Sequence, residues 1–324
     1  MLPMLLLTLL TQFILSKRIA IIGSGNWATT IARLLASNIE EREDLTYDPE
    51  VRMWTIHETY EGRNLTDLIN THHENFKYLP GYLLSSNIIA TEDMQYAIHG
   101  ADVLCFIIPH QFAEEVLNQM IPYVQSNATC ISLTKGISFD QEGPVLISSM
   151  IRRKLKLDKV AVLMGANIAS DVAAENFVES TLACEDTDVA EELKQLFQTS
   201  NFRIILSSDV AGVELCGALK NIIAMGVGFC DGMGIGISSK AAIINQGLQE
   251  IIAFNQLFAP SAQVLSSAQT LIPSLTMEPT YLRGTQFSVH VEWPMWWPPL
   301  LVAEIASVLL SSLGVSQSER GYIL

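Results

Sequence analysis

The stretch "RIAIIGSGNWATTIARLLA" constrains the fold of this chain more than any other. An apolar run ends at Gly23, and a helical pattern begins after Gly25 and carries Ala28 in its first turn. Gly23 permits a tight turn, Gly25 lets a pyrophosphate approach the backbone, and Ala28 allows close packing of helix on strand. A helix N-terminus also offers unpaired N–H groups to phosphates. A glycine turn without a ligand is the alternative, but the strand and helix on either side favour a dinucleotide site.

Similar apolar runs alternate with helical patterns up to residue 208. The runs predict strands at 18–22, 51–56, 102–108, 129–134, 160–165, 181–184 and 202–206, and the patterns predict helices at 26–37, 113–121, 145–156 and 188–198. Most of these runs are apolar on both faces, as strands of a buried parallel sheet are. We therefore predict an α/β protein whose residues 18–208 form a doubly wound Rossmann-type parallel sheet.

From Asp209 the pattern is helical, with long apolar segments at 209–230 and 239–258. They predict the start of an all-helical domain. Residues 259–324 show no clear helical periodicity and form an atypical tail, so we expect the helical domain to be truncated. Residues 1–17 form an apolar extension that lacks a basic start and a small-residue cleavage site, and it is short for a membrane span. A secretion signal is the alternative, and a membrane-anchored form is less favoured still.

Charge and cysteine content exclude several classes of protein. The chain carries 34 acidic and 19 basic residues, a net charge of -15, which would repel nucleic acid. Its five cysteines form no Cys-x-x-Cys pair and mostly lie in apolar runs, as reduced core residues of a cytosolic protein do. The adjacent His72 and His73 point in different directions on most backbones and make a poor metal pair, so we expect no metal.

A few polar residues lie where chemistry could occur. Lys220 interrupts an apolar helix, where burial would lower its pKa and suit a general acid/base, although a lysine that extends its head to the surface is equally compatible. Lys135 follows a strand and could depress that pKa further and hold an anionic substrate, or it could be an ordinary loop lysine. Asn167 could be a ligand or a turn residue, and we interpret His110 as a loop residue rather than a base.

One acidic residue bears on the choice of dinucleotide. Glu58, in "MWTIHE", follows the second expected strand, where an acidic side chain usually binds the adenosine ribose. His57 stands between this glutamate and the strand, so the preference for NAD over NADP is only a leaning.

Several longer motifs show a family resemblance. They are "GSGNWATTIA", "LTDLINTHHENFKYLPG", "ADVLCFIIPHQF", "ISLTKG", "VLMGANIASDVA", "VELCGALKNIIAMGVGFCDGMG" and "KAAIINQGLQEIIAF". In this order, over about residues 18–258, the chain resembles the NAD-dependent glycerol-3-phosphate dehydrogenases of eukaryotic cytosolic type. The resemblance implies a cytosolic, homodimeric oxidoreductase that uses NAD to interconvert sn-glycerol 3-phosphate and dihydroxyacetone phosphate.

The resemblance also implies residue roles. It makes Lys220 the general acid/base, and it assigns substrate contacts to Lys135, Asn167 and Asn221. The residues that it places on the dinucleotide are Gly23, Ser24, Gly25, Asn26, Trp27, Ala28, Ile56, Phe112 and Ala169.

Some positions depart from the family. Ala28 replaces a third glycine, Ile56 replaces an aromatic residue near the adenine, and Asn245 stands where an arginine is expected. The family motifs "CGVAD" and "GGRN", the latter for the substrate phosphate, are absent from the chain. The alternative function is therefore a non-catalytic NAD(H)-binding protein that has lost the substrate-phosphate motif.

The tail explains these absences if its reading frame is shifted. In "VEWPMWWPPLL" (291–301) the single codons of Trp and Met fix part of the underlying sequence. In the shifted frame, the stretch from His290 onward permits CGVADVVATxxGGRNR, with four positions forced. We therefore infer that residues from about 259 onward are translated from an unspliced or frame-shifted region.

Peptide mass spectrometry of the native protein beyond Phe258 tests this inference. We expect peptides that contain ADVVAT and GGRNR. Peptides that match "VEWPMWWPPLL" as printed would instead show that the tail is real and would favour the non-catalytic alternative.

Overall fold

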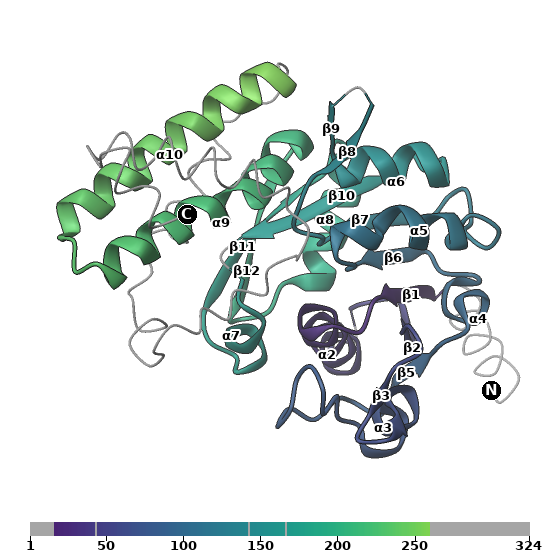
Figure 1. The fold of residues 1–324 in the computed structure, drawn as a ribbon. Helices are drawn as coiled ribbons and strands as arrows, with labels where there is room; N and C mark the ends of the chain where they lie inside the picture. Colours follow the sequence, from purple (N-terminus) through teal and green to yellow (C-terminus); the bar gives the residue numbers. More distant parts are fainter. Residues whose placement is uncertain (1–15, 43, 142, 166, 260–324) are drawn as a thin grey trace, which may run out of the picture.

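The computed structural model describes residues 16–42, 44–141, 143–165 and 167–259. A sheet of eight strands lies at its centre, in the order β12-β11-β10-β7-β6-β1-β2-β5 (Figure 1). The strands are β1 (Lys17–Ile22), β2 (Tyr47–Trp54), β5 (Ile88–Thr91), β6 (Val103–Phe106), β7 (Thr129–Ser132), β10 (Val160–Gly165), β11 (Val178–Ala183) and β12 (Phe202–Ser207).

The strand order confirms the doubly wound fold. β1 pairs in parallel with β2 on one side and with β6 on the other, so the chain winds outward in both directions from β1. In such sheets ligands bind beyond the carboxyl ends of the strands where the winding reverses. The prediction of a parallel sheet needs one correction, because β10 and β11 are antiparallel. Their connection through the short helix α7 (Ala169–Ala173) returns the chain beside β10 without a crossover.

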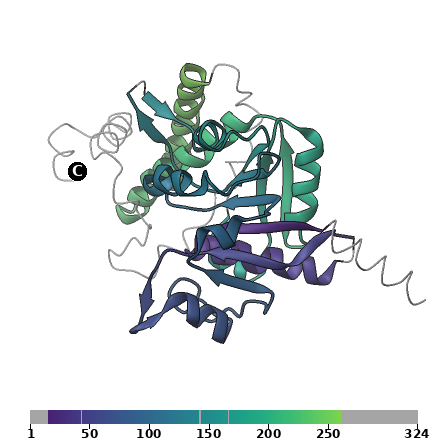
Figure 2. The same ribbon diagram turned by 90° about the vertical axis from the view of Figure 1, so that its right-hand side faces the viewer.

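Helices cover both faces of the sheet. The side chains of β1 alternate, so that Ile19 and Ile21 join one core and Ala20 and Ile22 join the other. The first core also contains residues of α2 (Asn26–Glu41), α3 (Leu65–His72) and α8 (Thr187–Phe197). The second contains residues of α4 (Met94–Ile98), α5 (His110–Met120) and α6 (Ile147–Leu155). Figure 2 shows these two layers from the side.

Short elements account for most of what sequence patterns missed. The structure adds β5, α3, α4 and α7 to the expected elements. It also adds two small hairpins, made of β3 (Thr59–Tyr60) with β4 (Arg63–Asn64) and of β8 (Ser138–Asp140) with β9 (Gly143–Val145). Such segments are too short to show a clear hydrophobic period.

Two long helices follow the sheet, as predicted. They are α9 (Val210–Gly232) and α10 (Ile237–Phe258). α9 packs on β10 and β11 and then against α10, where a Cβ atom on Gly247 would lie 2.6 Å from Ile223. Residues Val210–Cys230 are long and apolar enough to cross a membrane. However, 67% of the apolar 18-residue window within them is buried in the protein, as in the core helix of a folded domain.

Glycines allow the close packing at the end of β10. A Cβ atom on Gly165 would lie 2.8 Å from the Glu179 carbonyl oxygen and from the Ser180 Cα. Both atoms belong to the backbone of β11, so no side-chain rotation relieves the overlap.

We therefore expect Gly165→Ala to lower the free energy of unfolding by about 1 to 3 kcal/mol, as overpacked substitutions do. Urea unfolding followed by circular dichroism measures this change. Gly232→Ala is the matched control, because a Cβ atom there meets nothing within 4 Å. Equal stability of the Gly165 variant and the wild type would contradict the packing described for β10.

Candidate functional site

The glycine-rich turn lies at the point where the winding of the sheet reverses. Gly23 has φ +125°, and a Cβ atom there would lie 2.3 Å from the carbonyl oxygen of Ile107, just beyond β6. Its N–H donates to the Trp54 carbonyl oxygen at 3.0 Å, at the end of β2. The turn is therefore fixed among the carboxyl ends of β1, β2 and β6, and only glycine fits at position 23.

The start of α2 suits a pyrophosphate. Gly25 is the N-cap and has no side chain to cap the helix, and the first turn contains no acidic residue that would repel an anion. A Cβ atom on Gly25 would meet nothing within 4 Å, so the backbone there is open to a ligand. Asn26 Oδ1 and Trp27 Nε1 are buried without a hydrogen-bond partner among the described residues. These residues fit a dinucleotide.

A buried asparagine holds this turn from outside the motif. The Asn75 side chain donates to the Ser24 carbonyl oxygen at 2.9 Å and to Thr29 Oγ1 at 2.8 Å. Thr29 Oγ1 itself donates to the same carbonyl at 3.1 Å. Sequence reasoning did not single out Asn75, although it lies in the "HHENFKYLPG" motif. Its amide therefore fixes the backbone of the glycine-rich turn.

Lys220 is buried in α9, with 6% of its surface exposed. Its ammonium donates a hydrogen bond to the carbonyl oxygen of Gly165, the last residue of β10. Burial lowers the pKa of Lys220 to about 7, and the positive charge of Lys135 contributes to the shift. The structure thus contradicts an extended surface lysine and agrees with the buried alternative.

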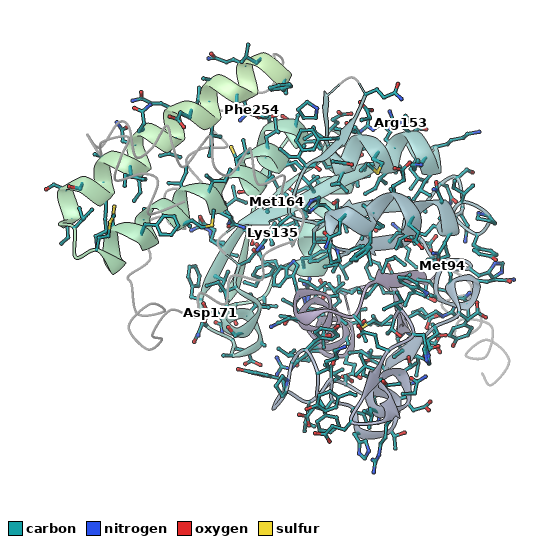
Figure 3. All side chains as sticks on the ribbon, in the orientation of Figure 1. Met94, Lys135, Arg153, Met164, Asp171 and Phe254 are labelled. Carbon is teal, nitrogen blue, oxygen red and sulfur yellow. The ribbon has the colours of Figure 1, made fainter. Side chains whose placement is uncertain are left out.

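Lys135 joins the glycine-rich turn to Lys220. It follows β7, and its Nζ lies 5.9 Å from the centre of the Trp27 ring. The preceding Thr134 donates from Oγ1 to the Ile108 carbonyl oxygen at 2.9 Å, which fixes the loop against the segment after β6. Figure 3 labels Lys135 in the middle of the molecule. Lys135 is also close enough to Lys220 for its charge to lower the pKa of Lys220, but the prediction that the two lysines share one substrate site stays a prediction.

Three more of the expected residues lie in different positions relative to the two lysines and the glycine-rich turn. Asn167 is buried and donates to Ser180 Oγ at 3.1 Å, while its Oδ1 has no partner among the described residues. The Ala169 carbonyl accepts from Thr30 Oγ1 at 3.4 Å, so α7 lies against the first turns of α2. Asn221 is exposed and lies about 100° around the helix from Lys220, so the structure does not bring it to the ammonium.

Two of the residues expected on the dinucleotide lie on the surface. Ile56, after β2, is 61% exposed, and Phe112, in the first turn of α5, is 50% exposed. The Glu58 carboxylate accepts a hydrogen bond from the Tyr78 hydroxyl at 2.9 Å and forms an ion pair with Lys77 at 3.2 Å. Its role as a ribose ligand stays a prediction.

His110 is not a loop residue, because it begins α5. Its ring lies 2.7 Å from the place that a Cβ atom on Gly136 would take, so the loop that carries Lys135 packs on it. Burial lowers the pKa of His110, and its Nδ1 has no hydrogen-bond partner among the described residues. Pro109 is the N-cap of α5, and the sequence interpretation missed this helix start.

The described residues contain no group of three or more His, Cys, Asp or Glu side chains that could hold a metal ion. His73 ends α3 in a left-handed conformation, and the ring of His72 packs on Phe76. The expectation that the protein uses no metal stays a prediction.

Fold and site together define a doubly wound dinucleotide-binding protein with a buried lysine at the end of its sheet. Residues 18–190 match the sequence signature of the "NAD-dependent glycerol-3-phosphate dehydrogenase N-terminus", and residues 209–273 match that of the C-terminus. The chain belongs to the family of NAD-dependent glycerol-3-phosphate dehydrogenases.

Individual relatives agree with this assignment. The chain is 48% identical over 255 residues to the cytoplasmic glycerol-3-phosphate dehydrogenase [NAD(+)] of Rattus norvegicus, which covers 79% of this chain and 72% of the rat protein. The solved structure of the Saccharomyces cerevisiae glycerol-3-phosphate dehydrogenase matches with a TM-score of 0.75 and 32% identity, over 94% of this chain and 92% of that one. The Dunaliella salina structure matches with a TM-score of 0.76 and 34% identity, over 94% of this chain and 56% of that one.

We expect Gly25→Ala to weaken NADH binding at least about tenfold, because backbone that must approach a pyrophosphate has no room for a methyl group. The melting temperature should hardly change, since the new methyl group meets no protein atom within 4 Å. NADH fluorescence titration and thermal unfolding measure the two effects. Unchanged NADH affinity would contradict the assignment of this turn to the pyrophosphate.

Proposed function

We propose that Lys220 is the general acid/base in the NAD-dependent interconversion of sn-glycerol 3-phosphate and dihydroxyacetone phosphate. Membership of the family supports the reaction and the cofactor. The observation that carries the role of Lys220 is its buried ammonium, which is held against the Gly165 carbonyl and near a second cation. The glycine-rich turn from Gly23 to Ala28 would hold the dinucleotide, which would supply a hydride acceptor for oxidation and a hydride donor for reduction.

The protonation state of Lys220 suits both directions. An ordinary lysine, with a pKa of about 10.4, is almost fully protonated at neutral pH and makes a poor base. At a pKa of about 7 the neutral amine and the ammonium coexist near neutral pH. The amine accepts the proton of the C2 hydroxyl during oxidation, and the ammonium donates a proton to the carbonyl oxygen during reduction.

The surrounding groups orient this proton transfer. The Gly165 carbonyl accepts from Lys220 and so fixes the direction in which Nζ points. Lys135 places a second positive charge nearby and would attract the anionic substrate. Asn167 has a buried acceptor oxygen for a substrate hydroxyl. We assign substrate contacts to Lys135 and Asn167. The side chain of Asn221 is exposed, and its contact with the substrate rests on the family resemblance alone.

The finer expectations rest on the family. We propose a cytosolic location, because the rat relative is named cytoplasmic, and a homodimer, because the resemblance implies one. Three large apolar side chains on α10, Ile237, Leu257 and Phe258, are exposed and are compatible with a dimer interface. The domain limits of 18–208 and 209–258 stay predictions. The frame-shift inference concerns residues outside those described.

Replacing Lys220 tests the proposal. We expect Lys220→Met to lower kcat about 10² to 10⁴-fold, the usual contribution of a general acid/base. The affinity for NADH should be unchanged, because the lysine acts on the substrate. The matched control is Lys159→Met, which removes an exposed lysine just before the opposite end of β10. A Lys220 variant with wild-type kcat would contradict the proposal.

The pH dependence supplies a second test. Oxidation needs the neutral amine, so kcat/KM for glycerol 3-phosphate should rise with pH through an apparent pKa of about 7 and then level off. Reduction needs the ammonium, so kcat/KM for dihydroxyacetone phosphate should fall through the same pKa. Steady-state rates across this range, measured in both directions, give the two curves. Curves without this mirror relation would contradict a single shared proton-transfer group.

A further inference from the structure

Glu214, on α9, is a buried carboxylate that the proposed reaction does not use. It has no exposed surface. The backbone N–H of Ser148 donates to its Oε1 at 3.1 Å and to its Oε2 at 3.3 Å, and the Ser148 hydroxyl donates to Oε2. These bonds join α9 to a helix 66 residues earlier in the chain.

The partner is the start of helix α6. This helix begins at Ile147, and its N-cap residue, Leu146, has no side-chain oxygen with which to cap it. The first N–H groups of a helix need acceptors when they are buried. Glu214 supplies the missing cap from a different helix. Burial raises the pKa of Glu214 to about 7, while the hydrogen bonds from Ser148 act in the opposite direction. A carboxyl group keeps an acceptor oxygen in either protonation state.

Glu214 lies on the same row of α9 as Lys220. Residues three apart on a helix form an inclined row along its surface, and Glu214, Gly217 and Lys220 follow this spacing. The middle member packs on the sheet, because a Cβ atom on Gly217 would lie 2.7 Å from Cγ and Sδ of Met164. Figure 3 labels Met164 close above Lys135 in that view. One row of α9 thus contacts α6, Met164 and the Gly165 carbonyl in turn.

We infer that Glu214 is a positioning residue that anchors α9 to α6 and thereby holds the Lys220 ammonium against Gly165 and away from water. The two ends of the row are fixed by polar contacts, and the glycine between them allows the close approach. Small displacements of a reacting group cost large factors in rate, so such an anchor matters for catalysis. The inference rests on the proposed role of Lys220.

The experiment measures the pKa of Lys220 without requiring turnover. The folded protein is reductively methylated at a series of pH values, and peptide mass spectrometry gives the pH midpoint of labelling at Lys220. Burial and then the charge of Lys135 lower the pKa of Lys220, and Lys135 is left unchanged in every variant. The variants are Glu214→Ala, Glu214→Gln and Glu192→Ala.

Glu192 is the matched control. Its carboxylate also joins distant elements, because it accepts from Lys17 Nζ at 2.5 Å and from the Tyr47 hydroxyl at 2.8 Å, but it lies on α8. If general destabilisation alone shifted the labelling midpoint of Lys220, both Glu214→Ala and Glu192→Ala would therefore show the shift.

We expect Glu214→Ala to raise the midpoint at Lys220 by about one pH unit, because a loosened α9 lets water reach the ammonium. Glu214→Gln keeps an acceptor oxygen for the Ser148 N–H and should restore most of the wild-type midpoint. Glu192→Ala should leave it unchanged. If Glu214→Ala does not fold, Ser148→Ala removes one of the same hydrogen bonds and should give a smaller shift in the same direction.

An unchanged midpoint in a folded Glu214→Ala variant would overturn the inference, as would an equal shift in Glu192→Ala. If Glu214→Ala does not fold, an unchanged midpoint in a folded Ser148→Ala variant would overturn the inference. Failure of the proposed function gives a different pattern, since Lys220→Met would then keep its activity whatever the labelling shows.

Discussion

The chemistry that we propose for this protein depends on one contact, the hydrogen bond from the buried Lys220 ammonium to the carbonyl oxygen of Gly165. A cation removed from water is costly unless it finds an acceptor, and here the acceptor is a carbonyl at the carboxyl end of β10. The hydrogen bond stabilises the ammonium form, while burial and the charge of Lys135 lower the pKa of Lys220 to about 7. Such a group exchanges protons near neutral pH, which an exposed lysine does poorly.

The sheet places the other groups around this contact. In a mostly parallel sheet the carboxyl ends of β1, β6, β7 and β10 lie along one edge, so the loops that follow them are neighbours. Gly23 touches the segment after β6, Lys135 follows β7 and approaches Trp27, and Gly165 ends β10. The glycine-rich turn and the proposed proton-transfer group therefore come from segments far apart in the chain. α9 then packs on β10 and brings Lys220 to the Gly165 carbonyl.

Much of this arrangement was predictable from sequence. The apolar runs located β10 at its observed limits and β1 to within one residue, because strands buried on both faces have a strong signal. α9 was clear from its length. The antiparallel β11 was not predictable, because hydrophobic periodicity carries no information about strand direction. β5, of four residues, was missed for want of a period.

Some residues of the site were also predictable from sequence, and others were not. The spacing of Gly23 and Gly25 predicted the glycine-rich turn, because local backbone geometry dictates those residue types; its role in dinucleotide binding stays a prediction. The sequence alone did not decide whether Lys220 is buried or extends to the surface, because burial depends on which distant segments pack against the helix. Asn75 and Glu214 were not singled out for the same reason, because their partners, Ser24 and Ser148, are distant in sequence. The structure corrected His110 from a loop to the start of α5.

The most direct test of this account is an NMR titration of the lysine side chains in the folded protein, with ¹³C-labelled lysine and with Lys220→Arg to assign the signal of Lys220. The account predicts one lysine Cε resonance that titrates at about pH 7 and is missing from the Lys220→Arg spectrum. If the Lys220 signal instead titrates near the ordinary lysine value of about 10.4, its ammonium is not held in a buried site, and the proposed acid/base role is wrong.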